Sequence, residues 1–220
     1  MRIDVLTLFP ESIQGFLDES IIKRAINSGK VEINLINFRK YSPLNNNQVD
    51  DTPYGGGAGM VLRCEPIFNA IEDIKTDDSY VIMLTPEGKT YNQKIAKSYI
   101  NMKHIILLCG HYEGFDERIK TLVDEEISIG DFILTGGEIA ATAIIDSVVR
   151  LIDGVISSDS LESESFNDNL LDYPTYTKPA EYKGMKVPEV LISGNHALID
   201  KWRNEQRIEK TKEKRPDLLD

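Results

Sequence analysis

The sequence is poor in cysteine and in long apolar runs, and it has no excess of glycine or proline. It holds two cysteines, Cys64 and Cys109, which form no CxxC spacing and have no pair of histidines beside them. Two cysteines cannot build a disulfide framework, so we expect free thiols in a reducing compartment. The 15 glycines and 9 prolines among 220 residues exclude a collagen-like or low-complexity chain.

No apolar run approaches the ~18 residues that a membrane-spanning helix needs. The first residues, Met1 to Val5, show neither an apolar signal segment nor a cleavage site. Hydrophobic residues make up 41% of the chain and charged residues 28%, which is typical of a globular protein and excludes overall disorder. We therefore expect a soluble, cytoplasmic protein.

Positive charge is also scarce, because 25 Lys and Arg stand against 36 Asp and Glu, a net charge of -11. This balance argues against binding nucleic acid by bulk attraction to phosphate. The charge is uneven, however. Residues 151–177 hold six acids and no Lys or Arg, whereas the tail from Lys201 to Arg215 holds seven basic residues and three acids. The tail could form a local basic surface on an acidic body, or a solvated helix face.

Segments of strand type and helix type alternate along the first two thirds of the chain. Short apolar or alternating runs predict strands, and apolar spacings of three to four residues predict helices. This order favours an α/β fold with a mainly parallel sheet. Strands are expected at 3–9, 31–38, 81–84 and 105–109, and helices at 11–27, 64–74, 93–100, 115–123 and 137–150.

The alternation stops near residue 155. Residues 156–172 are acidic and rich in small polar side chains, which predicts a flexible linker. A third part, residues 173–220, ends in a helical tail. We therefore divide the chain into a domain at 1–155, a linker at 156–172 and a small C-terminal domain at 173–220.

Glycines cluster where three predicted turns follow apolar segments. Gly88 follows the segment 81–84, Gly110 follows 105–109, and Gly130 follows 126–129. In open α/β sheets ligands bind beyond the carboxyl ends of the strands, and glycine there permits close backbone approach. The three turns together predict one pocket. Ordinary turn chemistry is the alternative for each glycine taken alone.

Two familiar nucleotide-binding motifs are absent. Gly88-Lys89-Thr90 resembles the end of a P-loop, but the glycine required five residues earlier is replaced by Met83. A GxGxxG pattern beginning at Gly55 fails because its last position is Met60. Both departures count against a nucleotide-binding enzyme of P-loop or Rossmann type.

Six motifs spread from Arg2 to Leu219 carry a close family resemblance. They read LTLFPE at 6–11, DDTPYGGGAGM at 50–60, CGHYEGFDER at 109–118, SIGDFILTGGE at 128–138, YPTYTKP at 173–179 and SGNH at 193–196. In order and content they resemble the bacterial tRNA (guanine-N1)-methyltransferase (TrmD) family of the SPOUT class. Several long, ordered matches make chance an inadequate explanation.

The resemblance implies a SPOUT-type parallel sheet with a deep trefoil knot, plus a small C-terminal helical domain that binds tRNA. It implies transfer of a methyl group from S-adenosylmethionine to N1 of guanine 37, beside the anticodon, in tRNAs with guanine at positions 36 and 37. It also implies a homodimer whose active sites are shared between subunits. Family activity is linked to Mg²⁺, but no metal ligands are assigned. The alternative from another class is a non-catalytic SPOUT-fold RNA-binding protein.

By match to the family motifs, twelve residues would bind the cofactor, with Glu113 beside its methionine moiety. They are Leu84, Thr85, Pro86, Gly110, Glu113, Ile129, Gly130, Phe132, Ile133, Leu134, Gly136 and Gly137.

Guanine N1 carries a proton near neutral pH, so the reaction needs a general base and a cation near the developing charge on O6. The resemblance assigns these roles to Glu164 and Arg150. Glu164 departs from the family, whose best-described members have Asp there. The longer side chain puts the geometry of the base in question, and Asp168 is a nearby competitor.

The substrate guanine must be splayed out of its loop to react. The segment from Tyr54 to Met60 predicts a wall for it, because its glycines permit close approach and Tyr54 can stack on the base. Four other aromatic residues could stack as well or belong to a core: Tyr112, Tyr173, Tyr176 and Trp202. His196 could contact substrate or cap a helix. The residues expected to meet tRNA are Tyr54, Gly55, Gly59, Tyr112, Asp168, His196 and Arg203.

Overall fold

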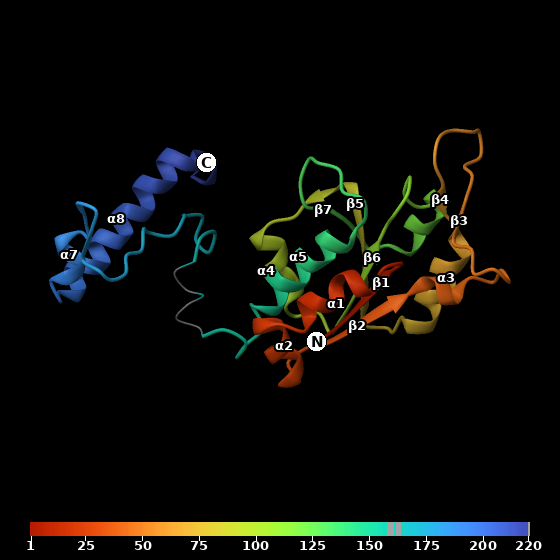
Figure 1. Ribbon diagram of the computed structural model, residues 1–220, viewed down its shortest axis with the longest axis horizontal. Helices are drawn as coiled ribbons and strands as arrows, with labels where there is room; N and C mark the ends of the chain where they lie inside the picture. Colours follow the sequence, from red (N-terminus) through yellow and green to blue (C-terminus); the bar gives the residue numbers. More distant parts are fainter. Residues whose placement is uncertain (158–160, 162–163, 220) are drawn as a thin grey trace. The chain divides into compact units, whose positions relative to one another are not determined.

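The computed structural model describes residues 1–157, 161 and 164–219 (Figure 1). The chain divides into two compact units, Met1–Ile156 and Ser157–Asp220, which are treated separately below. The predicted linker at 156–172 lies partly outside the described residues, so its flexibility stays a prediction. Within the parts of the chain described, no helix is long and apolar enough to cross a membrane.

A five-stranded parallel sheet forms the centre of the first unit, in the order β2-β1-β6-β5-β7. This confirms the prediction of an α/β fold with a parallel sheet. β6 is buried over its whole length, between β1 and β5. The strands are β1 (Arg2–Thr7), β2 (Glu32–Asn37), β5 (Ser79–Thr90), β6 (His104–Cys109) and β7 (Glu125–Ser128).

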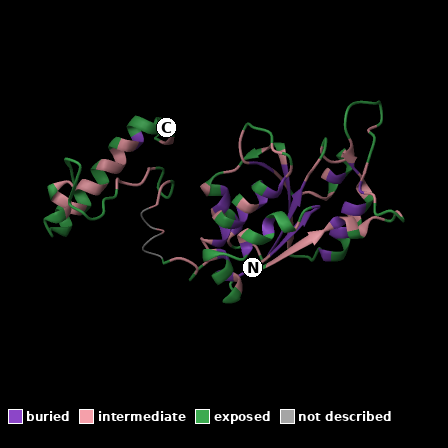
Figure 2. Cartoon of the chain, viewed as in Figure 1, coloured by how far each residue is buried: buried purple, intermediate pink, exposed green. Residues whose placement is uncertain are grey.

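Helices cover both faces of this sheet, and the purple strands of Figure 2 mark the buried centre. Ile105 and Leu107 of β6 belong to one hydrophobic cluster, whereas Ile106 and Leu108 belong to the other. Successive strand residues point to opposite faces, so a strand covered on both sides must be apolar throughout. One cluster includes residues of α1 (Glu11–Leu17), α2 (Ser20–Asn27), α4 (Gln93–Tyr99) and α5 (Glu138–Val149). The other includes residues of α3 (Cys64–Ile74) and the 3-10 helices η1 (Phe38–Tyr41) and η2 (Glu117–Leu122).

The structure corrects three sequence-based boundaries. The helix expected at 11–27 is two helices, because Ser20 adopts a left-handed φ of 52° that ends one helical path before the next begins. The helix expected at 115–123 is the shorter 3-10 helix η2, whose start is capped when the Asp116 side chain accepts from the Arg118 N–H. Only Ile119 of η2 is buried, so too little apolar surface supports a longer α-helix.

The strand expected at 81–84 continues as β5 to Thr90. Its pairing with β7 shifts register between Leu84 and Lys89, which both lie opposite Ile127. The intervening residues therefore bulge out of the sheet. Gly88 permits this path, because a Cβ there would lie 2.4 Å from the backbone nitrogen of Ile127.

The second unit is built around the long helix α8 (His196–Lys214), which begins before the predicted tail. The Asn195 side chain caps α8 by accepting from the Leu198 N–H, so Asn195, and not His196, is the capping residue. Around it lie the hairpin β8 (Glu181–Tyr182) and β9 (Met185–Lys186), the short α7 (Glu189–Ile192) and η3 (Pro216–Leu218). Among this unit's described residues, Thr211 alone is fully buried.

Candidate active site

A cavity of about 420 Å³ lies at the carboxyl ends of β6 and β7 and beside the bulge of β5. Three backbone turns form its wall: residues 85–87, 110–115 and 129–137. The turns that the glycine pattern singled out therefore meet at one place, although they are distant in sequence. All twelve residues expected to bind the cofactor line this cavity, as does Tyr112. Its position at the ends of parallel strands is where α/β sheets usually bind ligands.

The third turn packs against β6 too closely for side chains. A Cβ on Gly137 would lie 2.7 Å from the Cα atom of Cys109, and one on Gly136 would lie 2.2 Å from Nε2 of His111. The Gly137 N–H donates to the Gly110 carbonyl at 3.0 Å, which joins two walls of the cavity. Glycine at both positions is thus what lets α5 begin directly behind the cavity.

Glu138, the first residue of α5, organises the base of the cavity. Its carboxylate accepts a hydrogen bond from the Thr7 hydroxyl of β1, and its Oε2 atom lies 2.8 Å from Nε2 of His111. The Phe9 ring packs on His111 with centroids 4.7 Å apart. The buried carboxylate thereby connects β1, α5 and the turn that follows β6. Sequence reasoning missed these residues, although a threonine inside an apolar strand was a usable signal.

Lys120 of η2 forms ion pairs with three glutamates at or near the cavity lining. Its Nζ atom lies 2.8 Å from Glu87, 3.1 Å from Glu117 and 3.7 Å from Glu126. Hydrogen bonds to Glu87 and Glu117 raise the pKa of Lys120, so it stays charged at neutral pH. Because Glu87, Glu117 and Lys120 all line the cavity, its electrostatics combine one cation with several carboxylates.

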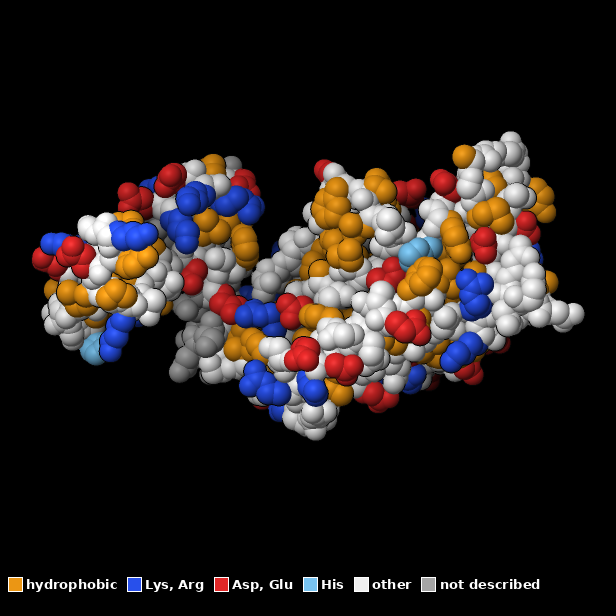
Figure 3. Space-filling view, in the orientation of Figure 1, with side chains coloured by type: hydrophobic (Ala, Val, Ile, Leu, Met, Phe, Trp, Pro, Cys, Tyr) orange, Lys and Arg blue, Asp and Glu red, His pale blue; other side chains and the backbone are white. Residues whose placement is uncertain are grey.

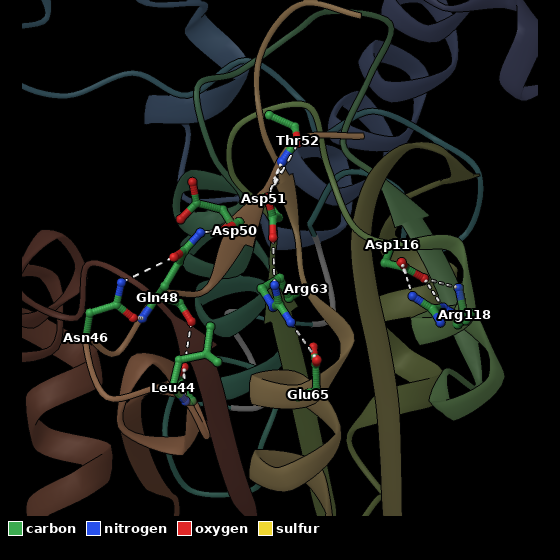
Figure 4. Close-up of polar contacts among 11 residues, drawn as sticks. Leu44, Asn46, Gln48, Asp50, Asp51, Thr52, Arg63, Glu65, Asp116 and Arg118 are labelled. Carbon is green, nitrogen blue, oxygen red and sulfur yellow. Dashed lines mark hydrogen bonds and ion pairs between the residues drawn. The ribbon is translucent and has the colours of Figure 1, made fainter. Parts of the chain in front are cut away.

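The glycine-rich loop at 53–60 connects two short strands, β3 (Asp50–Asp51) and β4 (Val61–Leu62). Next to β4, the Arg63 guanidinium forms ion pairs with the carboxylates of Asp51 and Glu65, each with a nitrogen–oxygen distance of 2.7 Å (Figure 4). Tyr54 is fully exposed on the loop, so its ring is free to stack on another ring.

The other end of this loop meets the cavity wall at Glu113. Gly59 has a positive φ of 79°, and a Cβ there would lie 2.4 Å from Oε1 of Glu113. The Glu113 N–H donates to the Met60 carbonyl at 2.9 Å. Gly55, by contrast, lies next to Tyr54 in the exposed part of the loop. Tyr112, with a φ of 59°, is exposed at the cavity lining.

The two residues expected to carry the chemistry belong to different units. Arg150 is the half-buried C-cap of α5 in the first unit, and Glu164 is half-buried in the second. Asp168 forms two hydrogen bonds with the Arg207 guanidinium, one of them 3.0 Å long. Arg207 lowers the pKa of Asp168, which makes Asp168 a weaker base than an ordinary carboxylate.

The remaining residues expected to meet tRNA lie on or beside α8. His196 is its exposed first residue, and Arg203 stacks over the Tyr173 ring at 4.8 Å. Among the described residues, no group of three or more His, Cys, Asp or Glu side chains is arranged to hold a metal ion.

Comparison with known proteins places the chain in a family. The model of the family "tRNA (Guanine-1)-methyltransferase TrmD" matches residues 1–220. A protein of Malacoplasma penetrans is 62% identical over 219 residues, which cover all of this chain and 97% of that protein. Relatives from Staphylococcus epidermidis and Mycoplasma capricolum are 56% and 55% identical, over all of this chain and 91% and 92% of theirs. All three bear the name tRNA (guanine-N(1)-)-methyltransferase.

Proposed function

The chain belongs to the tRNA (guanine-1)-methyltransferase family, and from this membership we propose that it methylates N1 of guanine 37 in tRNA with S-adenosylmethionine as the methyl donor. One observation carries the proposal for this chain. The twelve residues at the family's cofactor positions come from three separated turns, and all of them line one cavity.

The cavity suits the cofactor in size and chemistry. About 420 Å³ lies within the range of ~300–1,000 Å³ for small-molecule sites. Leu84, Ile129 and Leu134 offer apolar surface for an adenosyl group, and backbone groups of the glycine turns offer hydrogen bonds. The carboxylate of Glu113 suits a cationic sulfonium and an ammonium group. When bound, S-adenosylmethionine supplies an electrophilic methyl group.

We assign the general base to Glu164. Its carboxylate would accept the proton from guanine N1 and so free the lone pair that attacks the methyl group. Asp168 is the weaker choice, because two hydrogen bonds to Arg207 lower its pKa. Arg150 would stabilise the negative charge that develops on guanine O6.

We propose that the protein acts as a homodimer in which each active site takes residues from both subunits. The first unit exposes apolar side chains at and near the cavity, among them Phe9, Tyr112, Phe132, Ile133 and Ile139. Figure 3 shows hydrophobic side chains gathered over the loop between β7 and α5. Exposed apolar surface of this kind is typical of an interface, and a second copy of the chain would cover it.

We also infer that the five-stranded sheet carries the deep trefoil knot of the SPOUT class and that the C-terminal domain docks on tRNA. The fully exposed Tyr54 ring supports a role in stacking on a base of the anticodon loop. His196 and Arg203 are exposed enough to meet the substrate, and Gly55 and Gly59 would let its backbone approach closely. Although the chain is acidic overall, with a net charge of -11, the basic residues of the tail would pair with phosphates, so tRNA binding should weaken steeply with salt.

The deciding experiment incubates purified protein with S-adenosylmethionine and a transcribed tRNA that has guanine at positions 36 and 37. Methylation at N1 blocks base pairing, so it appears as a stop in primer extension and as a mass increase of the nucleoside. A matched tRNA with adenine at position 37 serves as the control. Binding of cofactor and tRNA without methylation, with Mg²⁺ present or absent, would favour the non-catalytic alternative.

A further inference from the structure

One face of α8 is covered by the segment of residues 164–173, named here the docked segment. Arg203 stacks over the Tyr173 ring at 4.8 Å, and Arg215, just after the helix, lies 5.7 Å from the Phe166 ring centre. Between these two ends, Arg207 pairs with Asp168. The contacts recur at about every turn of the helix, so the segment runs along it.

Backbone hydrogen bonds complete the docking. The Leu171 N–H donates to the buried Thr211 hydroxyl at 2.9 Å, and the Lys210 ammonium donates to the Asp172 carbonyl at 2.8 Å. A buried hydroxyl that accepts a backbone N–H fixes the segment more strictly than a surface ion pair does. The segment is therefore held to α8 by its backbone as well as by its side chains.

Hydrogen bonds within the docked segment also close it into a loop. The Ser165 hydroxyl accepts from the Asp172 N–H at 2.9 Å, and the Phe166 N–H donates to the Leu170 carbonyl at 2.8 Å. The Asn167 N–H donates to the Glu164 carbonyl at 3.3 Å. Glu164 is thus the first residue of a closed loop, and docking of that loop fixes its backbone relative to α8.

Arg207 is the central side chain of this arrangement. Its side chain is only 14% exposed and makes two hydrogen bonds to Asp168. A guanidinium so covered is poorly placed to meet a phosphate group from solution. The Arg203 side chain, at 42% exposed, is much more accessible. Arg207 therefore differs from Arg203 in what it can bind.

We propose that Arg207 and Asp168 are positioning residues for methyl transfer, holding the docked segment on α8 so that the Glu164 carboxylate is presented in one orientation. This role rests on the proposed function, in which Glu164 is the base. It makes the second unit a preformed carrier of the base. The ion pair is expected to act on the rate of the chemical step and to leave tRNA affinity unchanged.

The experiment uses three variants of the full-length protein. Two are the single variants Asp168→Asn and Arg207→Gln. The third is a double variant that reverses the charges, with Asp168→Arg and Arg207→Asp together. Single-turnover methylation of the tRNA is measured beside the dissociation constants for tRNA and S-adenosylmethionine. Each single variant should slow methylation about 10- to 100-fold, as misplacement of a catalytic group by about 1 Å does, with dissociation constants within about twofold. The charge reversal should recover a large part of the lost rate.

Glu205→Gln is the matched control, because it removes the same charge from another ion pair of α8, with Lys201 at 3.9 Å. It should leave the rate within about twofold of wild type. Hydrogen exchange provides a readout without catalysis. The amides of Leu171 and Asp172 should exchange faster in Asp168→Asn and in Arg207→Gln, and Arg207→Lys should restore part of their protection. This milder variant also guards against a failure to fold.

Three results would overturn the proposal. If Arg207 instead binds tRNA phosphate, Arg207→Gln will raise the dissociation constant for tRNA, and Asp168→Asn will lower it by freeing the guanidinium. Wild-type rates in both single variants would exclude a positioning role and leave the methyltransferase proposal intact. Absence of methylation by the wild-type protein would reject the proposed function, and this role with it.

Discussion

The two units of the chain, each taken by itself, are stabilised by different interactions. In the first unit, fully buried hydrophobic residues occur at many positions between Ile3 and Val149. They form two clusters, one on each face of the central sheet. In the described part of the second unit, Thr211 alone is fully buried, and ion pairs and cation-aromatic contacts fasten a segment to one long helix. Where such contacts are exposed, each contributes only about 0–1 kcal/mol.

This contrast matches a division of labour. A cavity that must recognise a cofactor in one shape benefits from a close-packed scaffold. The proposed base needs one orientation against its substrate, and polar contacts on one helix can fix that orientation without a buried core. The first unit should therefore govern stability and cofactor binding, and the second should govern the rate of proton removal.

The largest effect is expected at Glu164. Replacing Glu164 by Gln removes the proposed base and should lower the single-turnover methylation rate about 10²- to 10⁴-fold, without changing thermal unfolding. The measurement is methylation with enzyme in excess over tRNA. Glu181→Gln in the exposed hairpin is the control and should retain the wild-type rate. Full activity of Glu164→Gln would mean that another group takes the proton.

The next largest effect is on stability, at Leu107 in the middle of the buried strand β6. Leu107→Ala should lower the free energy of unfolding by about 2–5 kcal/mol, because it removes apolar contacts and leaves a cavity. Leu191→Ala, at a half-buried position of the second unit, should lower the free energy of unfolding by less than about 1 kcal/mol, well below the loss expected for Leu107→Ala. Chemical denaturation of both variants measures this difference. Equal costs would contradict the contrast between the two units.

A smaller effect is expected at Thr211. Thr211→Val keeps the shape but removes the acceptor of the Leu171 N–H, so about 1–3 kcal/mol of local stability should be lost. Hydrogen exchange should reveal the loss at Leu171 and its neighbours. Unfolding of the first unit and S-adenosylmethionine binding should not change. A loss of protection within β6 would show that the units are energetically coupled.

The smallest effect concerns the reactivity of Cys64. Burial and the hydrogen bond to Asp116 raise the pKa of this half-buried thiol to about 11. At pH 8 its thiolate is scarce, so alkylation should be about 100-fold slower than for a thiol with the usual pKa of ~8.5. Asp116→Asn removes the negative partner, lowers the pKa of Cys64 and should speed labelling, as followed by mass spectrometry. Rapid labelling of wild-type Cys64 would contradict this assignment.

Much of the scaffold followed from local sequence pattern. Strands covered on both faces must be apolar throughout, and the runs at 81–84 and 105–109 showed this directly. Glycines 88, 110, 136 and 137 marked the turns, because a side chain at each would strike a neighbouring segment. The same turns line the cavity, so its location could be predicted before its shape was known.

Other features could not be predicted from local sequence pattern, because they depend on contacts between distant residues. The hydrogen bond from Thr7 to Glu138 joins residues 131 positions apart, and the Arg207–Asp168 pair joins residues 39 apart. The break at Ser20 and the 3-10 geometry of η2 also went against a helical spacing that looked continuous. Periodicity reports which face of an element is apolar, but not which polar side chains the folded chain will bring together.

The sequence by itself therefore determined the α/β class, the turns that form the cavity and the family to which the chain belongs. The tertiary structure decided how polar groups are paired, because pairing depends on the register in which distant segments meet. It connected Glu138 to His111 behind the cavity and left Tyr54 in solvent. It also paired Asp168 with Arg207.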